Sequence, residues 1–222
     1  MITVTGTKCD IIFTCEALAW YAGVPLKEAY LDADAAYAVA SRAPGIVRER
    51  YGLDVAPSLM HFSYGSLLAL GAEVEFADTG VPAVRPILDR LEDFLRWEET
   101  HPFDHPLIRH FLDLQQQVSG RLGVALAPTF GNEAPFTAAL LLRGPEFLID
   151  LEEQPALARA FLTRLEDNWL ASHRALCDYQ GQPAAQTGIG LADDFSGFLP
   201  PSAFRAYVLS GYARLFAETS AT

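Results

Sequence analysis

The chain has 222 residues, of which 50% are hydrophobic, and its 28 acidic and 16 basic residues give a formal net charge of −12. This composition is sufficient for one large domain with a sizeable core, and it excludes a disordered chain. The acidic balance argues against nucleic acid and anionic membrane surfaces as partners. The sequence shows no apolar run of membrane-spanning length, no secretory leader and only three cysteines, so we expect a cytoplasmic protein.

Short apolar or alternating stretches predict strands, and longer amphipathic or alanine-rich stretches predict helices. The strands are expected over residues 4–13, 53–59, 73–76, 122–128 and 184–192. The helices are expected over residues 15–21, 26–50, 66–70, 86–97, 107–117, 136–142, 145–151, 155–179 and 200–216. Because strands and helices alternate, the pattern predicts parallel βα units in a single α/β domain over residues 1–222.

Three segments carry the sequence motifs that are most specific for a protein family. The first reads APFTAALLLRG over 134–144 and EFLIDL over 146–151. The second reads LADDF over 191–195 and LPPSAFRAYVL over 199–209, and the third reads YGLD over 51–54 and ALGAEVEF over 69–76. Together they resemble the uroporphyrinogen decarboxylase superfamily, which includes the decarboxylase itself and corrinoid-linked methyltransferases.

The resemblance implies a TIM (β/α)₈ barrel whose active site lies at the C-terminal ends of the strands. Such a barrel needs roughly 250 residues or more. The chain therefore looks like an incomplete barrel of parallel strands. We expect either the N-terminal part of a longer protein, without the C-terminal third of its relatives, or an abridged relative.

Asp193 and Asp194 are the leading site candidates, because they follow a predicted strand at the end that opens into the pocket of such a barrel. Side chains alternate along a strand, so one of the two is expected to face the barrel axis. In the structural alternative, one acid braces a loop and the other faces solvent.

Glu133, Phe136 and Thr137 follow another predicted strand. Pro135 presets the first turn of the next helix, whose free amides can hold an anion or can simply be capped. His61 and Tyr64 follow the strand at 53–59 and complete the set of candidate substrate-binding residues.

Positions at which this sequence departs from the family's patterns help to distinguish between the branches of the family. The resemblance aligns Phe62 with the aspartate that holds the pyrrole N–H groups in the decarboxylase, and it places Leu141 within one position of a conserved tyrosine. The methyltransferases often have glutamate where Ser66 falls. We therefore expect a corrinoid-dependent methyltransferase, with uroporphyrinogen decarboxylase of tetrapyrrole synthesis, or a non-catalytic corrinoid- or porphyrin-binding subunit, as alternatives.

The resemblance implies methylcobalamin or another corrinoid as a partner substrate, presented by a corrinoid protein, together with a small-molecule substrate. Full-length relatives use zinc, bound by an H-x-C…C set in their C-terminal third, to form a thiolate near neutral pH. None of the five histidines of this chain lies in such a motif, so we assign no metal ligand and leave open whether the chain is active alone. Core packing explains Cys9 and Cys15, and a shared face of the long predicted helix explains His173 and Cys177, which lie one turn apart.

Overall fold

The structure is a computed structural model that describes residues 2–4, 7–9, 13–78, 80–98, 100–128, 130–186 and 189–219. The chain divides into two compact units. The first comprises Met1–Phe62, Phe76–Ala83 and Arg109–Thr129, and the second comprises Ser63–Glu75, Val84–Ile108 and Phe130–Thr222. Each unit has a hydrophobic core of its own.

The first unit contains a small hairpin and a helical layer. Its elements are β1 (Ile2–Val4), β2 (Thr7–Cys9), α1 (Cys15–Ala22), α2 (Leu26–Leu31), α3 (Ala33–Tyr51) and most of α5 (Pro106–Leu122). The strands β1 and β2 pair antiparallel, with Thr3 opposite Lys8. Both α1 and α2 pack against α3.

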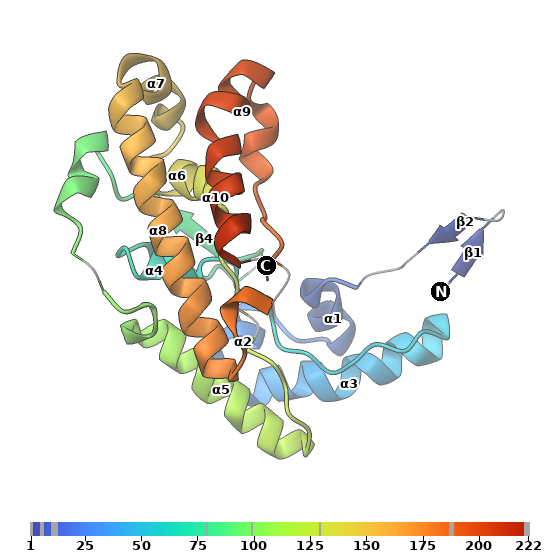
Figure 1. Ribbon diagram of the computed structural model, residues 1–222. Helices are drawn as coiled ribbons and strands as arrows, with labels where there is room; N and C mark the ends of the chain where they lie inside the picture. The colour runs from blue at the N-terminus through green and yellow to red at the C-terminus, as the bar shows by residue number, and fades with distance from the viewer. Residues whose placement is uncertain are drawn as a thin grey trace. The chain divides into compact units, whose positions relative to one another are not determined.

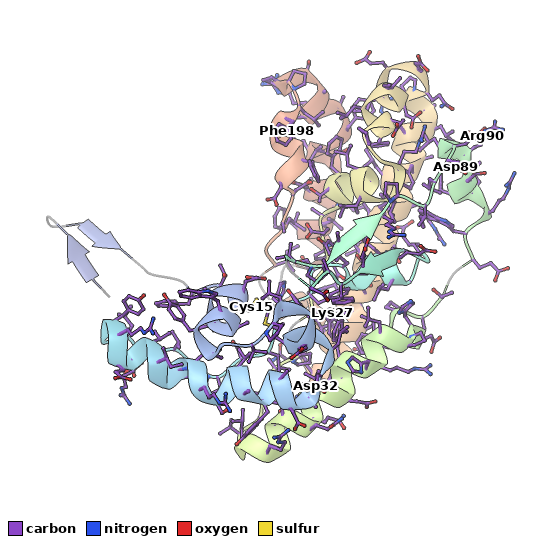
Figure 2. All side chains as sticks on the ribbon, turned by 180° about the vertical axis from the view of Figure 1, so that it is seen from behind. Cys15, Lys27, Asp32, Asp89, Arg90 and Phe198 are labelled. Atoms are coloured by element: carbon purple, nitrogen blue, oxygen red, sulfur yellow. The ribbon has the colours of Figure 1, made fainter. Side chains whose placement is uncertain are left out.

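Capping residues explain where the helices of the first unit begin and end. The Thr14 hydroxyl accepts a hydrogen bond from the Ala17 amide at 3.3 Å and begins α1. Asp32 divides the single helix expected over 26–50 into α2 and α3, because its extended backbone ends one helix and its carboxylate caps the next. Figure 2 labels Asp32 at this junction.

The core of the first unit joins α3 and α5 to the segments that follow them. Its buried members are Ala36, Ala40, Leu59, Leu114, Val118 and Leu126. Phe62 is 2% exposed, and its ring lies 6.2 Å from that of Phe76 and 4.8 Å from that of Phe111. This aromatic cluster fixes the end of the extended segment that precedes His61.

The second unit is built on α8 (Pro155–Gln180), which packs against α6, α7 and α10 (Figure 1). Its other helices are α4 (Gly65–Leu68), α6 (Pro135–Arg143), α7 (Glu146–Glu153), α9 (Pro201–Tyr207) and α10 (Leu209–Thr219). The 3-10 turns are η1 (Leu91–Arg96), η2 (Pro102–Asp104), η3 (Ala184–Gln186) and η4 (Asp194–Phe198). The strands β3 (Glu73–Glu75) and β4 (Ala83–Arg85) form a two-stranded sheet.

The core of the second unit is apolar, with charged groups buried as pairs. Phe136, Phe147 and Phe161 are among its fully buried side chains. The Arg143 guanidinium lies 2.9 Å from the carboxylate of Asp150, which is 4% exposed. Charges buried in this way must be paired, since an isolated one costs several kcal/mol.

The predicted helices over 15–21, 66–70, 136–142, 145–151 and 155–179 are confirmed, with ends shifted by a few residues. The strands expected over 53–59 and 122–128 are wrong: both segments have irregular backbone, and α5 extends to Leu122. Their apolar runs fill the core of the first unit without pairing, because a strand needs a partner and the prolines Pro57 and Pro128 cannot donate to one.

Further corrections concern the two ends of the chain. The stretch over 4–13 is not one strand, because it includes the end of β1 and all of β2, which pair antiparallel, and residues 5, 6 and 10–12 lie outside the described residues. The stretch over 184–192 begins with η3 and pairs only at Ala192, with residues 187 and 188 outside the described range. The helix expected over 86–97 is wrong: the segment begins after β4 and forms only the 3-10 turn η1. The last helix is interrupted at Val208.

The described residues therefore show a mostly helical α/β fold with two two-stranded sheets, and they do not show the predicted TIM barrel. One parallel pairing is present, as an isolated bridge between Glu133 and Ala192. No helix in the described ranges is long and apolar enough to cross a membrane.

Candidate functional site

Three segments of the second unit meet where α6 begins. Glu133 and Ala192 form the parallel bridge, and the Ala134 amide donates a hydrogen bond to the Ala192 carbonyl at 2.9 Å. The Glu133 amide donates to the Ser63 carbonyl at 3.0 Å. The residues that follow Glu133 and Ala192 are therefore brought together with the residues at the start of α4.

Gly65 allows this close approach. Its amide donates to the Gly131 carbonyl at 3.0 Å. A Cβ atom at position 65 would lie 2.9 Å from the same carbonyl oxygen, a backbone atom that cannot move away cheaply. A glycine is therefore required where the two segments cross.

Both carboxylate oxygens of Asp193 accept hydrogen bonds from other residues of this chain. Its Oδ1 accepts from the Thr137 amide at 2.8 Å and from the Thr137 hydroxyl at 2.7 Å, and its Oδ2 accepts from the Tyr212 hydroxyl at 2.7 Å. The residue before α6 is Ala134, which has no side chain that can cap the helix. Asp193 therefore caps α6 from a distant part of the sequence.

This arrangement corresponds to the capping alternative for the first turn of α6. The Thr137 amide is occupied by a carboxylate of the same chain. The Thr137 hydroxyl also accepts from the Phe195 amide at 3.2 Å, and the Ser196 hydroxyl donates to the Asp193 carbonyl at 2.8 Å. These bonds fix η4 against α6.

Asp194 differs from Asp193 in its surroundings. Its side chain is exposed, whereas Asp193 is half-buried. The two acids thus lie in different environments, with Asp193 preceding η4 and Asp194 at its first position. Asp194 remains close enough to Glu133 for its charge to act on that carboxyl group.

The carboxyl group of Glu133 is strongly perturbed by its surroundings. Burial raises its pKa to about 7, and the charges of Asp194 and Asp193 add to the increase, against an opposing hydrogen bond with the Ser63 side chain. Such a carboxyl group exchanges a proton near neutral pH, which is the property of a general acid or base. Burial and the charge of Glu133 also raise the pKa of the Tyr64 hydroxyl.

The structure thus brings together Tyr64, Glu133, Thr137, Asp193 and Asp194. Phe136 is 1% exposed, and its ring packs 5.7 Å from that of Phe147 in the core of the second unit.

His61 belongs to the first unit and is exposed. Its backbone carbonyl accepts from the Tyr30 hydroxyl at 2.9 Å, and its amide donates to Cys15 Sγ at 3.3 Å.

Sequence reasoning missed Tyr212, because its contact with Asp193 links two segments that no local pattern relates. Burial, followed by the hydrogen bond with Asp193, raises the pKa of Tyr212 to about 12. Its hydroxyl therefore stays protonated at neutral pH and acts as a hydrogen-bond donor to Asp193. Tyr212 lies three residues after the LPPSAFRAYVL segment over 199–209, which is the sequence signal in this region.

Within the described part of the chain, no three His, Cys, Asp or Glu side chains gather as a metal-binding group. Cys177 is buried, and its Sγ lies 3.7 Å from His173 Nε2, one turn away on α8. The shared helix face expected for this pair is confirmed.

Comparison with known proteins identifies the family. The family model of uroporphyrinogen decarboxylase (URO-D) matches residues 12–222. A methyltransferase from Methanosarcina mazei has a similar fold, with a TM-score of 0.66 and 19% sequence identity, over 95% of this chain and 60% of that chain. The chain thus spans 60% of the length of that structure, and no curated protein matches its sequence. The chain belongs to the uroporphyrinogen decarboxylase family.

Proposed function

We propose that this chain is a methyltransferase-type member of its family, which moves a methyl group between a corrinoid and a small donor or thiol, and that it adopts part of a TIM barrel. The similarity to a methyltransferase fold supports this branch. Phe62 supports it further, because a buried phenylalanine cannot accept the pyrrole hydrogen bonds that decarboxylation requires.

The observation that carries the proposal is the half-buried Glu133 carboxyl group with a pKa of about 7. In transfer from methylcobalamin to a thiol, the S–C bond forms as the Co–C bond breaks, and the electron pair of the Co–C bond stays with the corrinoid. The thiol must lose its proton. We assign this proton to the Glu133 carboxylate, which in the reverse direction returns it as the acid.

The neighbouring residues have different roles in this proposal. Asp194 is exposed beside Glu133, and Tyr64 is half-buried beside it, so both are placed to contact a substrate. Thr137 and Asp193 bind one another and support the site. Phe136 is buried, and it supports the site through its packing in the core of the second unit.

Zinc activates the thiol in relatives, but the described residues do not offer a set of ligands that fits this ion. No step proposed for Glu133 passes through a metal bound by this chain. A corrinoid enters only as a substrate.

The test is methyl transfer from methylcobalamin to a thiol, with zinc added, by the full chain. We expect Glu133→Gln to lower the rate by about 100-fold, since a positioned acid or base contributes roughly 10²–10⁴-fold. The control is Glu152→Gln, an exposed carboxyl group on α7. An unchanged rate in Glu133→Gln would contradict the role of Glu133.

Two other results would favour the alternatives. Formation of coproporphyrinogen from uroporphyrinogen would establish the decarboxylase. Tight binding of a corrinoid or porphyrin without any turnover would establish a non-catalytic binding subunit.

A further inference from the structure

A cavity outside the candidate functional site lies within the second unit, between the end of α4, the segment that follows η1 and the middle of α8. Its volume is about 160 Å³. An engineered cavity of about 150 Å³ holds a molecule the size of benzene, whereas drug-sized ligands occupy roughly 300–1,000 Å³. The cavity therefore suits a small ligand, of about six to nine non-hydrogen atoms.

The inner part of the cavity is apolar. Ala69 and Leu70, which follow α4, are each 7% exposed and line it together with Ala171 of α8. Ala171 is exposed, so it lies where the cavity opens to solvent. A short aliphatic group of a ligand would be removed from water on this surface, which is favourable.

Two hydrogen bonds fix the walls of the cavity. The Thr100 hydroxyl donates to the Ala69 carbonyl, and the Asn168 side-chain amide donates to the Ser66 carbonyl at 2.8 Å. Both bonds connect α4 or its end to segments that are distant in the sequence. The cavity is therefore formed before any ligand binds, as is usual for small-molecule sites.

Charges of both signs line the same cavity. They belong to Arg164 and Asp167 on α8 and to Glu98 after η1. Asp167 is paired with Arg214 of α10, whereas the described residues offer Glu98 neither a hydrogen bond nor an ion pair. Arg164 is half-buried, so solvent screens its charge less than that of a fully exposed residue.

We propose that this cavity binds a small zwitterion, namely an α-amino acid with a short aliphatic side chain. The Arg164 guanidinium binds the carboxylate, for which its planar set of donors is suited, and the Glu98 carboxylate binds the ammonium group. The aliphatic side chain contacts Ala69 and Leu70. The inference does not depend on the proposed function of the Glu133 cluster.

A zwitterion fits this lining better than a ligand with a single charge. An anion would remove Glu98 from water without giving it a partner, and a cation would do the same to Arg164. A charged group that loses its contact with water in this way is costly. An amino acid supplies both partners at once.

The experiment follows the backbone amide signals of the ¹⁵N-labelled full chain as L-valine is added at neutral pH. We expect the amides of Ala69, Leu70 and Ala171 to shift and to saturate with a dissociation constant on the order of 1 mM. The amide of Glu133, in the other site, should not move.

Two further probes each lack one charge of valine. Isobutylamine has no carboxylate and isovalerate has no ammonium group, but both keep the branched aliphatic chain. We expect each to bind at least about 10-fold more weakly than L-valine, because a hydrogen bond with a charged group contributes roughly this factor or more.

Variants of the lining test the assigned contacts. Glu98→Gln and Arg164→Gln should each weaken the binding of L-valine by about 10-fold. Ala171→Phe should abolish it, because the ring occupies the cavity from an exposed helix position and leaves the core intact. The matched controls are Glu153→Gln and Arg205→Gln, which remove exposed charges on α7 and α9 and should bind as wild type does.

The absence of a saturable shift with L-valine would overturn the inference. Equally tight binding of isobutylamine or isovalerate would also overturn it, as would unchanged binding in Ala171→Phe, a variant that tests the site even if Arg164→Gln fails to fold. The titration measures binding at residues outside the Glu133 cluster, so its outcome is independent of methyl transfer.

Discussion

At the scale of single residues, the protonation of Glu133 is the property on which the account depends. A carboxyl group whose pKa is about 7 in the folded chain and near 4.5 when unfolded stabilises the fold fully below pH 4.5. This contribution is lost as the pH rises through about 7. In the folded chain, the ionised form of Glu133 is destabilised by burial and by the neighbouring acids, whereas the neutral form is not.

We therefore expect Glu133→Gln to raise the free energy of unfolding at pH 8 by about 1–2 kcal/mol relative to wild type, after allowance for solvent screening. At pH 4 the two proteins should be of similar stability. Urea unfolding at both pH values measures this difference. Equal stability of the two proteins at pH 8 would show that Glu133 is not destabilised in the folded chain.

A second prediction at this scale concerns the ion pair between Arg143 and Asp150, whose side chains are 13% and 6% exposed. Asp150→Ala leaves a buried guanidinium without its partner and should cost about 3–5 kcal/mol. Glu75→Ala breaks the exposed pair with Arg85, 2.8 Å apart, and should cost less than about 1 kcal/mol. Thermal unfolding of the two variants compares them, and similar losses would refute the difference.

At the scale of elements, local signals predicted helices well and strands poorly. Gly23 and Gly52 end α1 and α3 in left-handed conformations, and Pro135 and Pro155 begin α6 and α8, as the sequence indicates. These signals act within one turn of helix. The strands over 53–59 and 122–128 were predicted from apolar runs alone, which cannot tell a paired strand from an irregular core segment.

Asp32 is an element boundary that lies inside the single helix predicted over 26–50. Its Oδ1 accepts from the Asp34 amide at 2.9 Å and from the Ala35 amide at 2.8 Å. Asp32→Ala should cost about 1 kcal/mol of stability, whereas Asp32→Asn, which keeps an acceptor, should cost little. Chemical denaturation of both variants is the measurement, and equal losses would show that the cap is not the cause.

At the scale of the whole molecule, the sequence was informative about the family and about part of the site. The motifs over 134–144 and 191–195 drew attention to Glu133, Thr137, Asp193 and Asp194, which the structure does bring together. No local rule links Tyr212 to Asp193, because that hydrogen bond depends on how α10 packs on α8. The predicted single domain and the roles of these residues stay predictions.

The exposed end of η4 adds an apolar surface next to the cluster. Phe198 is 78% exposed and is labelled in Figure 2, and its ring lies 6.2 Å from that of Phe195. The Phe195 amide donates a hydrogen bond to the Thr137 hydroxyl, so this pair of rings is held by the same residue that binds Asp193.

The most direct test of the central claim is the pH dependence of methyl transfer from methylcobalamin to a thiol, compared between wild type and Glu133→Gln. The account predicts that the wild-type rate rises through a midpoint near the Glu133 pKa of about 7, and that this midpoint is absent in the variant. A variant profile with the same midpoint and the same rate as wild type would contradict it.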